Sequence, residues 1–177
     1  MSITSITTPE ILATLTALIA PGLVRGLGTA TPGSMCLEAA VSLAVHGTFG
    51  DAPPCVAAAD RDYAIRINDA AWSSPQARAE ALLPLAIAQI GTAGTDRTAW
   101  VRRLVEGTIR RVLPVTLRAA ASVHGSATHR AALEAAAVRC ERDGTRDAAD
   151  AAAGAASDAL LRLSVQVALD AYAAETP

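Results

Sequence analysis

The sequence predicts an all-α fold, a compact bundle of about six to seven short, alanine-rich helices. Alanine, the residue with the highest helix propensity, fills 42 of the 177 positions. Alternation of apolar and polar residues with a period of two is nearly absent, and β-branched residues do not cluster into strand-like runs. Glycine, proline and hydroxyl residues recur at intervals that suit helix ends, and they therefore set the expected boundaries.

The first helix has the clearest start. Thr8-Pro9-Glu10 supplies an N-cap, a proline at the first helical position and an early acid, so we expect a helix to about Ala20 that ends at Pro21-Gly22. Residues 21–33 contain four glycines and two prolines and are typical of a connector. Within it, Gly26-Leu27-Gly28 begins like a dinucleotide-binding fingerprint, but no strand precedes it, and we expect a flexible link.

The same signals predict the remaining helices and a division into two parts. The helices are expected over 34–47 with Ser34 as cap, 56–70, 74–91 from Ser74-Pro75, 95–124 from Thr95 and Asp96, 126–143, and 145–174 with a break near Gly154. Pro114 lies inside the fifth helix and should kink it, because proline lacks an amide hydrogen and crowds the preceding turn. The N-terminal helix with its connector (1–33) is expected to stand apart from one helical domain over 34–177.

Composition excludes several functions. All 15 basic residues are arginine, and the absence of lysine rules out a Walker-A phosphate loop, a Schiff-base lysine and a pyridoxal-phosphate anchor. A net charge of −2 argues against a dedicated nucleic-acid binder, which usually has an excess of basic residues. The longest apolar run, Ile11–Ala20, is too short to cross a membrane, and no cationic leader precedes it. An odd count of three cysteines favours a reducing, cytoplasmic setting, so we predict a cytoplasmic protein without cofactor.

The first candidate site gathers chemistry-bearing side chains in one segment. Its members are Cys36, Glu38, His46, Asp51, Cys55 and Asp69. Zinc sites normally contain a close cysteine pair, whereas Cys36 and Cys55 are 19 residues apart, so we expect no metal. A buried Cys36 that acts as a small apolar residue is the favoured interpretation. A metal- or thiol-dependent enzyme that uses Cys36, Cys55, His46 and Asp51, with His46 as base, is kept as an alternative.

The second candidate is an arginine stripe on the predicted fifth helix. Its members at helical spacing are Arg103, Arg110, Arg111 and Arg118. Guanidinium groups suit carboxylates and phosphates, so the stripe is a candidate surface for a partner, an anion or a nucleic acid. An acidic patch of Glu141, Asp143, Asp147 and Asp150 follows in sequence. The stripe and the patch could fold together within one chain or join two subunits.

A set of short motifs resembles a known group of proteins. The motifs are Met35-Cys36-Leu37-Glu38-Ala39-Ala40-Val41, Gly50-Asp51-Ala52-Pro53-Pro54-Cys55-Val56, Ile67-Asn68-Asp69, Ala77-Arg78 and Ile87-Ala88-Gln89-Ile90-Gly91-Thr92. Over residues 34–145 they resemble uncharacterised helical proteins of bacteria and their phages, which often carry histidine where this chain has Phe49. The resemblance implies a shared fold element around Cys36, Asp51 and Cys55 and a phage- or defence-associated role, but no catalytic residue.

Folding roles explain these motifs without catalysis. Asp51 is expected to accept amide hydrogens at the start of the next turn. Asn68-Asp69 is expected to end the third helix, because asparagine tolerates the left-handed region, and Trp72 should pack where the chain then reverses. The structural motif is therefore Cys36, Asp51, Cys55, Asn68, Asp69 and Trp72. The sequence favours a non-enzymatic helical module that binds a protein partner or itself.

Overall fold

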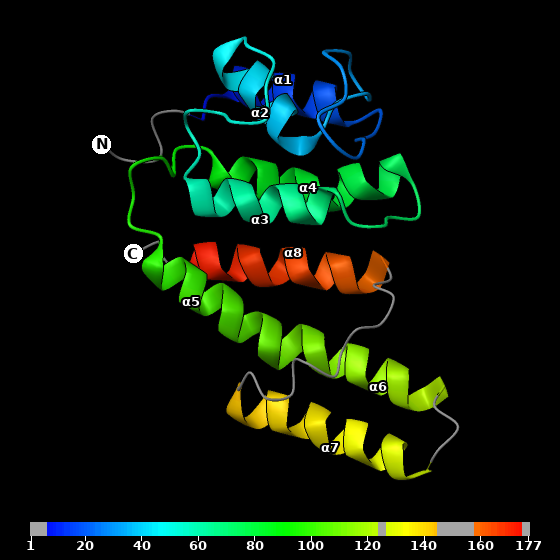
Figure 1. Cartoon of the computed structure of the whole chain (residues 1–177). Helices are drawn as coiled ribbons and strands as arrows, with labels where there is room; N and C mark the ends of the chain where they lie inside the picture. The colour runs from blue at the N-terminus through cyan, green and yellow to red at the C-terminus, as the bar shows by residue number, and fades with distance from the viewer. Residues whose placement is uncertain (1–6, 124–126, 145–157, 175–177) are drawn as a thin grey trace. The chain divides into compact units, whose positions relative to one another are not determined.

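The computed structural model describes residues 7–123, 127–144 and 158–174 (Figure 1). Its helices are α1 (Pro9–Ile19), α2 (Leu37–His46), α3 (Ala58–Asn68), α4 (Pro75–Gln89), α5 (Thr98–Gly107), the π-helical turn η2 (Thr108–Val112), α6 (Leu113–Val123), α7 (Ala127–Asp143) and α8 (Asp158–Ala173). Among these residues the only β pairing is an isolated bridge between Gly28 and Met35. The all-α prediction is confirmed.

The chain divides into two compact units, residues 1–97 and 98–177. We expected a division after residue 33 instead. Helix α1 packs against α2 and α4, and backbone hydrogen bonds tie the connector that follows it to α1 and α4. The Leu23 amide donates to the Pro75 carbonyl at 3.1 Å, and the Gly33 amide donates to the Leu18 carbonyl at 3.2 Å. Residues 7–33 therefore belong to the same unit as α2, α3 and α4.

Helix α2 is the centre of the N-terminal unit. It packs against α1, α3 and α4, and all residues from Leu37 to Ser42 are buried. A helix that is covered on all sides must take even its polar side chains into the core. This is why Glu38, in the first turn of α2, is 0% exposed.

The start of α2 differs from the prediction. Ser34 is not its cap, because the Ser34 amide and carbonyl close a tight turn with Thr31 and Thr29. The N-cap is Cys36, whose Sγ accepts a hydrogen bond from the Ala39 amide at 3.4 Å. Sulfur is a weak acceptor and is not among the usual cap residues, so helix-start rules pass over it.

The connector is a folded turn rather than a flexible link. The Val24 amide donates to Met35 and the Cys36 amide donates to Leu27, at 3.1 Å each. Gly28 has φ +74°, and an added Cβ would lie 2.1 Å from the Ser34 carbonyl oxygen. Glycine is required there, because the backbone needs both a left-handed conformation and a close approach.

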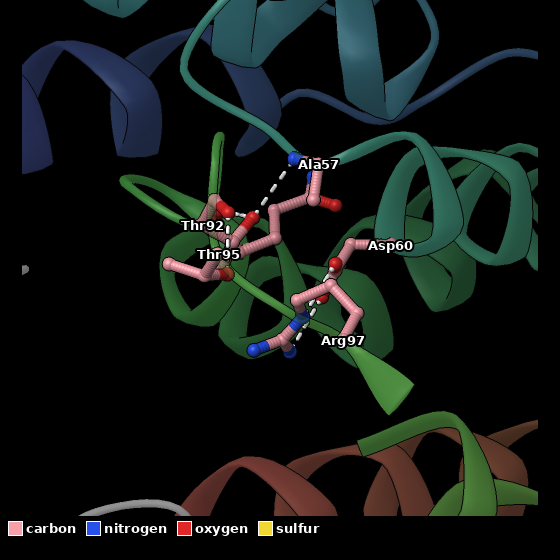
Figure 2. A network of polar contacts seen from close by, with 6 residues as sticks. Ala57, Asp60, Thr92, Thr95 and Arg97 are labelled. Atoms are coloured by element: carbon pink, nitrogen blue, oxygen red, sulfur yellow. Dashed lines mark hydrogen bonds and ion pairs between the residues drawn. The ribbon is translucent and has the colours of Figure 1, made fainter. Parts of the chain in front are cut away.

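A buried ion pair ends the N-terminal unit and sets where the next helix starts (Figure 2). Arg97 donates from Nε and Nη2 to the two carboxylate oxygens of Asp60, at 2.8 Å each. The Thr95 hydroxyl donates to the Thr92 carbonyl at 2.6 Å, which makes residues 92–95 a turn. Because Arg97 is held on α3, the helix begins at Thr98 and not at Thr95.

In the C-terminal unit, α6 packs against α7, and α5 packs against α8. The core beside α7 is built from small residues and a few larger ones: Ile109, Leu117, Ala136, Ala137 and Cys140. Trp100 on α5 contacts Tyr172 on α8 with ring centroids 5.1 Å apart. Gly107 lets these two helices approach closely, since an added Cβ would lie 2.5 Å from Val167.

Pro114 is accommodated by the π-helical turn that precedes it. The Leu113 amide reaches back five residues to the Thr108 carbonyl, so the turn is wider than in an α-helix. Such a turn relieves the crowding that proline imposes on the preceding turn, and α5, η2 and α6 therefore run on as one helical stretch.

Several other boundaries agree with the sequence. Helix α1 starts at the Thr8 cap, α4 starts at the Ser74 cap, and α7 ends at Gly144, whose amide donates to the Cys140 carbonyl at 3.0 Å. The predicted starts at Ser126 and Thr145 lie outside the described residues. Among the helices that the structure describes, none is both long and apolar enough to cross a membrane.

Candidate functional site

A small pocket lies where α2, α3 and the connector meet in the N-terminal unit. Its volume is about 40 Å³. The side chains in its wall that matter here are Leu27, Cys36, Glu38, Asp51, Asn68 and Asp69. Three of these carry carboxyl groups, and no basic side chain lines the pocket. Four of the six residues that the sequence grouped as a structural motif thus come together, namely Cys36, Asp51, Asn68 and Asp69.

Glu38 is the unusual group in this wall. Its Oε1 accepts a hydrogen bond from Gln89 Nε2 at 2.7 Å, while Oε2 is buried and has no partner among the described residues. The side-chain oxygen Oε1 of Gln89 is buried and unpartnered as well among the described residues. Burial raises the pKa of Glu38 to about 8, against the smaller lowering effects of the Gln89 hydrogen bond and of Arg61. At neutral pH the free protein therefore carries Glu38 mainly as the uncharged acid.

Asn68 and Asp69 hold the pocket together. Asn68 accepts a hydrogen bond from the Leu37 amide at 3.2 Å and donates to the Val24 carbonyl at 2.9 Å. Asp69 Oδ1 accepts from the Gly26 amide at 2.8 Å and from Asn68 Nδ2 at 2.9 Å. The two side chains thereby tie the end of α3 to the connector and to the start of α2. They position Glu38, which is the second residue of α2.

Asn68 and Asp69 end α3 as predicted, but the reason given for it was wrong. Asp69 has a right-handed backbone with φ −85°, and no described residue other than glycine has a positive φ. The amides of Asp69 and Ala70 close the last turn on the Ile65 and Ile67 carbonyls, and Trp72 Nε1 also donates to the Ile67 carbonyl at 2.9 Å. The predicted position of Trp72 at the chain reversal is correct, since it lies between α3 and α4.

Cys36 and His46, the nucleophile and base of the alternative thiol enzyme, lie at opposite ends of α2. Cys36 caps the start of α2 and His46 is its last residue, so about 15 Å of helix separates them. Burial raises the pKa of Cys36, and the charges of Glu38 and Asp51 raise it further. Burial also raises the pKa of Cys55. Nucleophilic cysteines need a lowered pKa and a base within hydrogen-bond reach, so this geometry does not favour the enzyme.

Asp51 and Cys55 have different positions in this region. Asp51 is exposed at the pocket, and among the described residues it does not accept the amide hydrogen bonds that the sequence led us to expect. Cys55 is buried, and its carbonyl accepts from the amides of Gly91 and Ala93 at 2.9 and 3.1 Å. Cys55 is not part of the pocket wall.

A metal centre finds no support in the described ranges. Nowhere within them do three or more histidine, cysteine, aspartate or glutamate side chains come together in a way that could hold a metal ion.

The four arginines of the stripe contact two different helices of the C-terminal unit, α7 and α8. Arg103 donates to the Ala171 carbonyl of α8 at 3.2 Å, and Arg111 pairs with Asp170 of α8. Arg118 pairs with Glu141 of α7 through two hydrogen bonds, of 2.6 and 2.9 Å. An α-helical wheel misses this division because the wider π turn changes the angular phase.

Arg110 joins the stripe to the acidic patch. Its Nη1 donates to the carbonyls of Glu141 and Arg142 at the end of α7, at 2.8 and 2.7 Å, and its Nε donates to Glu106 at 3.0 Å. Stripe and patch thus meet within one chain, one of the two arrangements left open by the sequence. Asp147 and Asp150 lie outside the described residues.

Sequence reasoning missed Gln89 as the partner of Glu38. A signal was present, since Gln89 stands alone in an apolar run from Ala81 to Ile90, where a buried amide needs a polar partner. Comparison with protein-family models, with curated proteins and with solved structures finds no match for this chain.

Proposed function

We propose that the chain is a non-enzymatic interaction module that binds a protein partner over the surface around the Glu38 pocket. One observation carries the proposal. In the described part of the N-terminal unit, only two large apolar side chains are exposed, Leu27 (41%) and Phe49 (37%). Leu27 lines the pocket, and Phe49 precedes Asp51 of its wall by two residues. Apolar side chains beside a polar pocket are typical of a protein-binding surface.

Two further observations favour binding over catalysis or nucleic-acid recognition. The thiols have raised pKa values, and His46 lies at the far end of α2 from Cys36. Three of the stripe arginines, Arg110, Arg111 and Arg118, are paired with carboxylates of their own unit, which reduces the positive charge offered to phosphates.

Affinity capture with matched variants tests the proposal. The full chain, a Leu27→Glu/Phe49→Glu variant and a Val105→Glu variant are immobilised, and the proteins they retain from a lysate of the native host are identified. Val105 is 47% exposed on α5, so its substitution is the control for added surface charge. We expect the wild type and Val105→Glu to retain the same protein, which then binds when purified, and the double variant to lose it.

Light scattering at several protein concentrations measures the molecular mass and so tests for self-association. Concentration-dependent growth in mass that Leu27→Glu/Phe49→Glu abolishes would replace the foreign partner with a second copy of the chain. A strict monomer that captures no protein, or a partner that the double variant retains, would contradict the proposal.

A further inference from the structure

We infer that the pocket at Glu38 receives a lysine ammonium group of the partner, and that this cation takes the place of a proton on Glu38. The inference rests on the proposed function for the identity of the partner, but the site itself can be tested alone. It combines an unpartnered buried oxygen, an acidic wall and a small volume.

The unpartnered oxygen comes first. Glu38 is 0% exposed, lines the pocket, and leaves Oε2 without a hydrogen-bond partner among the described residues. A buried acceptor without a donor is destabilising, so such groups are rare unless a ligand or a proton completes them. When no ligand is present, a proton on Oε2 completes the group.

The surroundings select a cation over a neutral group. Asp51 and Asp69 share the wall with Glu38, and no arginine lines it. The charged groups that act on Glu38 from neighbouring elements are Asp60 and Arg61 of α3 together with Asp51. Asp60 is already paired with Arg97. Arg61 acts on Glu38 and Arg78 acts on Asp69 from outside the wall, so the lining of the pocket itself contains no cation.

The volume and the composition of the chain select lysine. About 40 Å³ has room for a group the size of one or two water molecules, which matches an ammonium better than the planar, larger guanidinium. This chain contains no lysine, so a second copy has no lysine side chain to offer. We therefore assign the ammonium to a lysine of a different protein.

Titration of the full chain with n-butylammonium chloride, monitored by NMR of the backbone amides, tests the site. We expect saturable shifts of the Gly26, Leu37 and Ala39 amides. Since only ionised Glu38 accepts the cation, the apparent affinity should rise about tenfold per pH unit between about pH 6 and pH 8 and level off above that. The ammonium itself stays charged throughout this range.

Three variants make the test specific. Glu38→Gln can keep the contact with Gln89 but removes the charge, so it should abolish saturable binding and its pH dependence. Asp51→Asn, at an exposed position, should weaken binding several-fold while the pH dependence stays. Glu80→Gln, an exposed acid on α4, should leave binding unchanged.

The overturning results are equally concrete. No shift of these amides at about pH 8.5, or Glu38→Gln binding as tightly as the wild type, would overturn the inference. Tighter binding of n-propylguanidinium than of n-butylammonium would overturn the assignment to lysine. If butylammonium binds but no partner depends on Leu27 and Phe49, the proposed function fails and the site stands. If a partner depends on Leu27 and Phe49 but butylammonium does not bind, the proposed function stands and the ammonium site fails.

Discussion

Asn68, the last residue of α3, caps α2 from 31 residues away, because its Oδ1 accepts the hydrogen bond of the Leu37 amide. The first amides of a helix have no partner within the helix. Most caps come from the residue just before the helix, and here Cys36 fills that position with a weak sulfur acceptor. The Asn68 contact therefore supplies the stronger cap and joins two helices that surround the pocket.

Loss of the Asn68 side chain should destabilise the N-terminal unit strongly. Asn68→Ala leaves the buried Leu37 amide and the Val24 carbonyl without their side-chain partner, so we expect a loss of about 2–3 kcal/mol of unfolding free energy. Thr8→Ala, which removes the exposed cap of α1, should cost only about 1 kcal/mol. Urea unfolding compares the two. An equal or smaller loss for Asn68→Ala would show that the capping account is wrong.

Two glycines of the connector form a matched pair. Gly26 and Gly28 both have positive φ, but an added Cβ meets nothing within 4 Å at Gly26 and the Ser34 carbonyl at Gly28. Gly26→Ala should therefore cost about 1 kcal/mol from backbone conformation alone. Gly28→Ala should cost about 2 kcal/mol more, because the turn must also open. Similar melting temperatures for the two variants would contradict the folded connector.

The Asp60–Arg97 pair should show the energetics of a buried ion pair. Arg97→Met removes both charged hydrogen bonds that Arg97 makes to a 0% exposed carboxylate, and we expect a loss of about 3–5 kcal/mol. The double change Asp60→Leu/Arg97→Met should recover much of it, because no charge remains buried. The measurement is a double-mutant cycle by chemical denaturation, and additive single effects would speak against direct coupling.

The stability of the protein should depend on pH through Glu38. Its pKa is raised from 4.5 to about 8 in the folded protein, so over that range the folded state holds a proton that the unfolded chain has lost. Stability should fall as the pH rises through this window, by an amount on the order of 4 kcal/mol. Glu38→Gln cannot titrate and should flatten this dependence. Unfolding curves at about pH 5, 7 and 9 measure this dependence. If the unfolding free energy of Glu38→Gln falls with pH as steeply as that of the wild type, the assignment is refuted.

Much of the fold follows from local signals in the sequence. Thr8, Ser74 and Gly144 act at helix ends through contacts within a few residues, and the chain near them forms helices as predicted. The boundaries that failed depend on distant partners. Thr98 starts a helix because Arg97 binds Asp60, 37 residues away. No local pattern contains that information.

The site was predictable only in part. The motif residues Cys36, Asp51, Asn68 and Asp69 do meet, but the sequence assigned them separate local roles. Glu38 becomes decisive because α2 is enclosed by three other helices, which is a property of packing. The arginines of the stripe contact two different helices for a similar reason. The π turn before Pro114 changes their angular positions, and this turn arises from the strain of that proline within a packed helix.

Carbon-13 NMR of the Glu38 carboxyl during a pH titration, with and without butylammonium, tests the account most directly. A carboxyl that holds a proton until a cation replaces it should titrate near pH 8 in the free protein and at a lower pH with the cation bound. A midpoint near 4.5 that the cation does not move would contradict it.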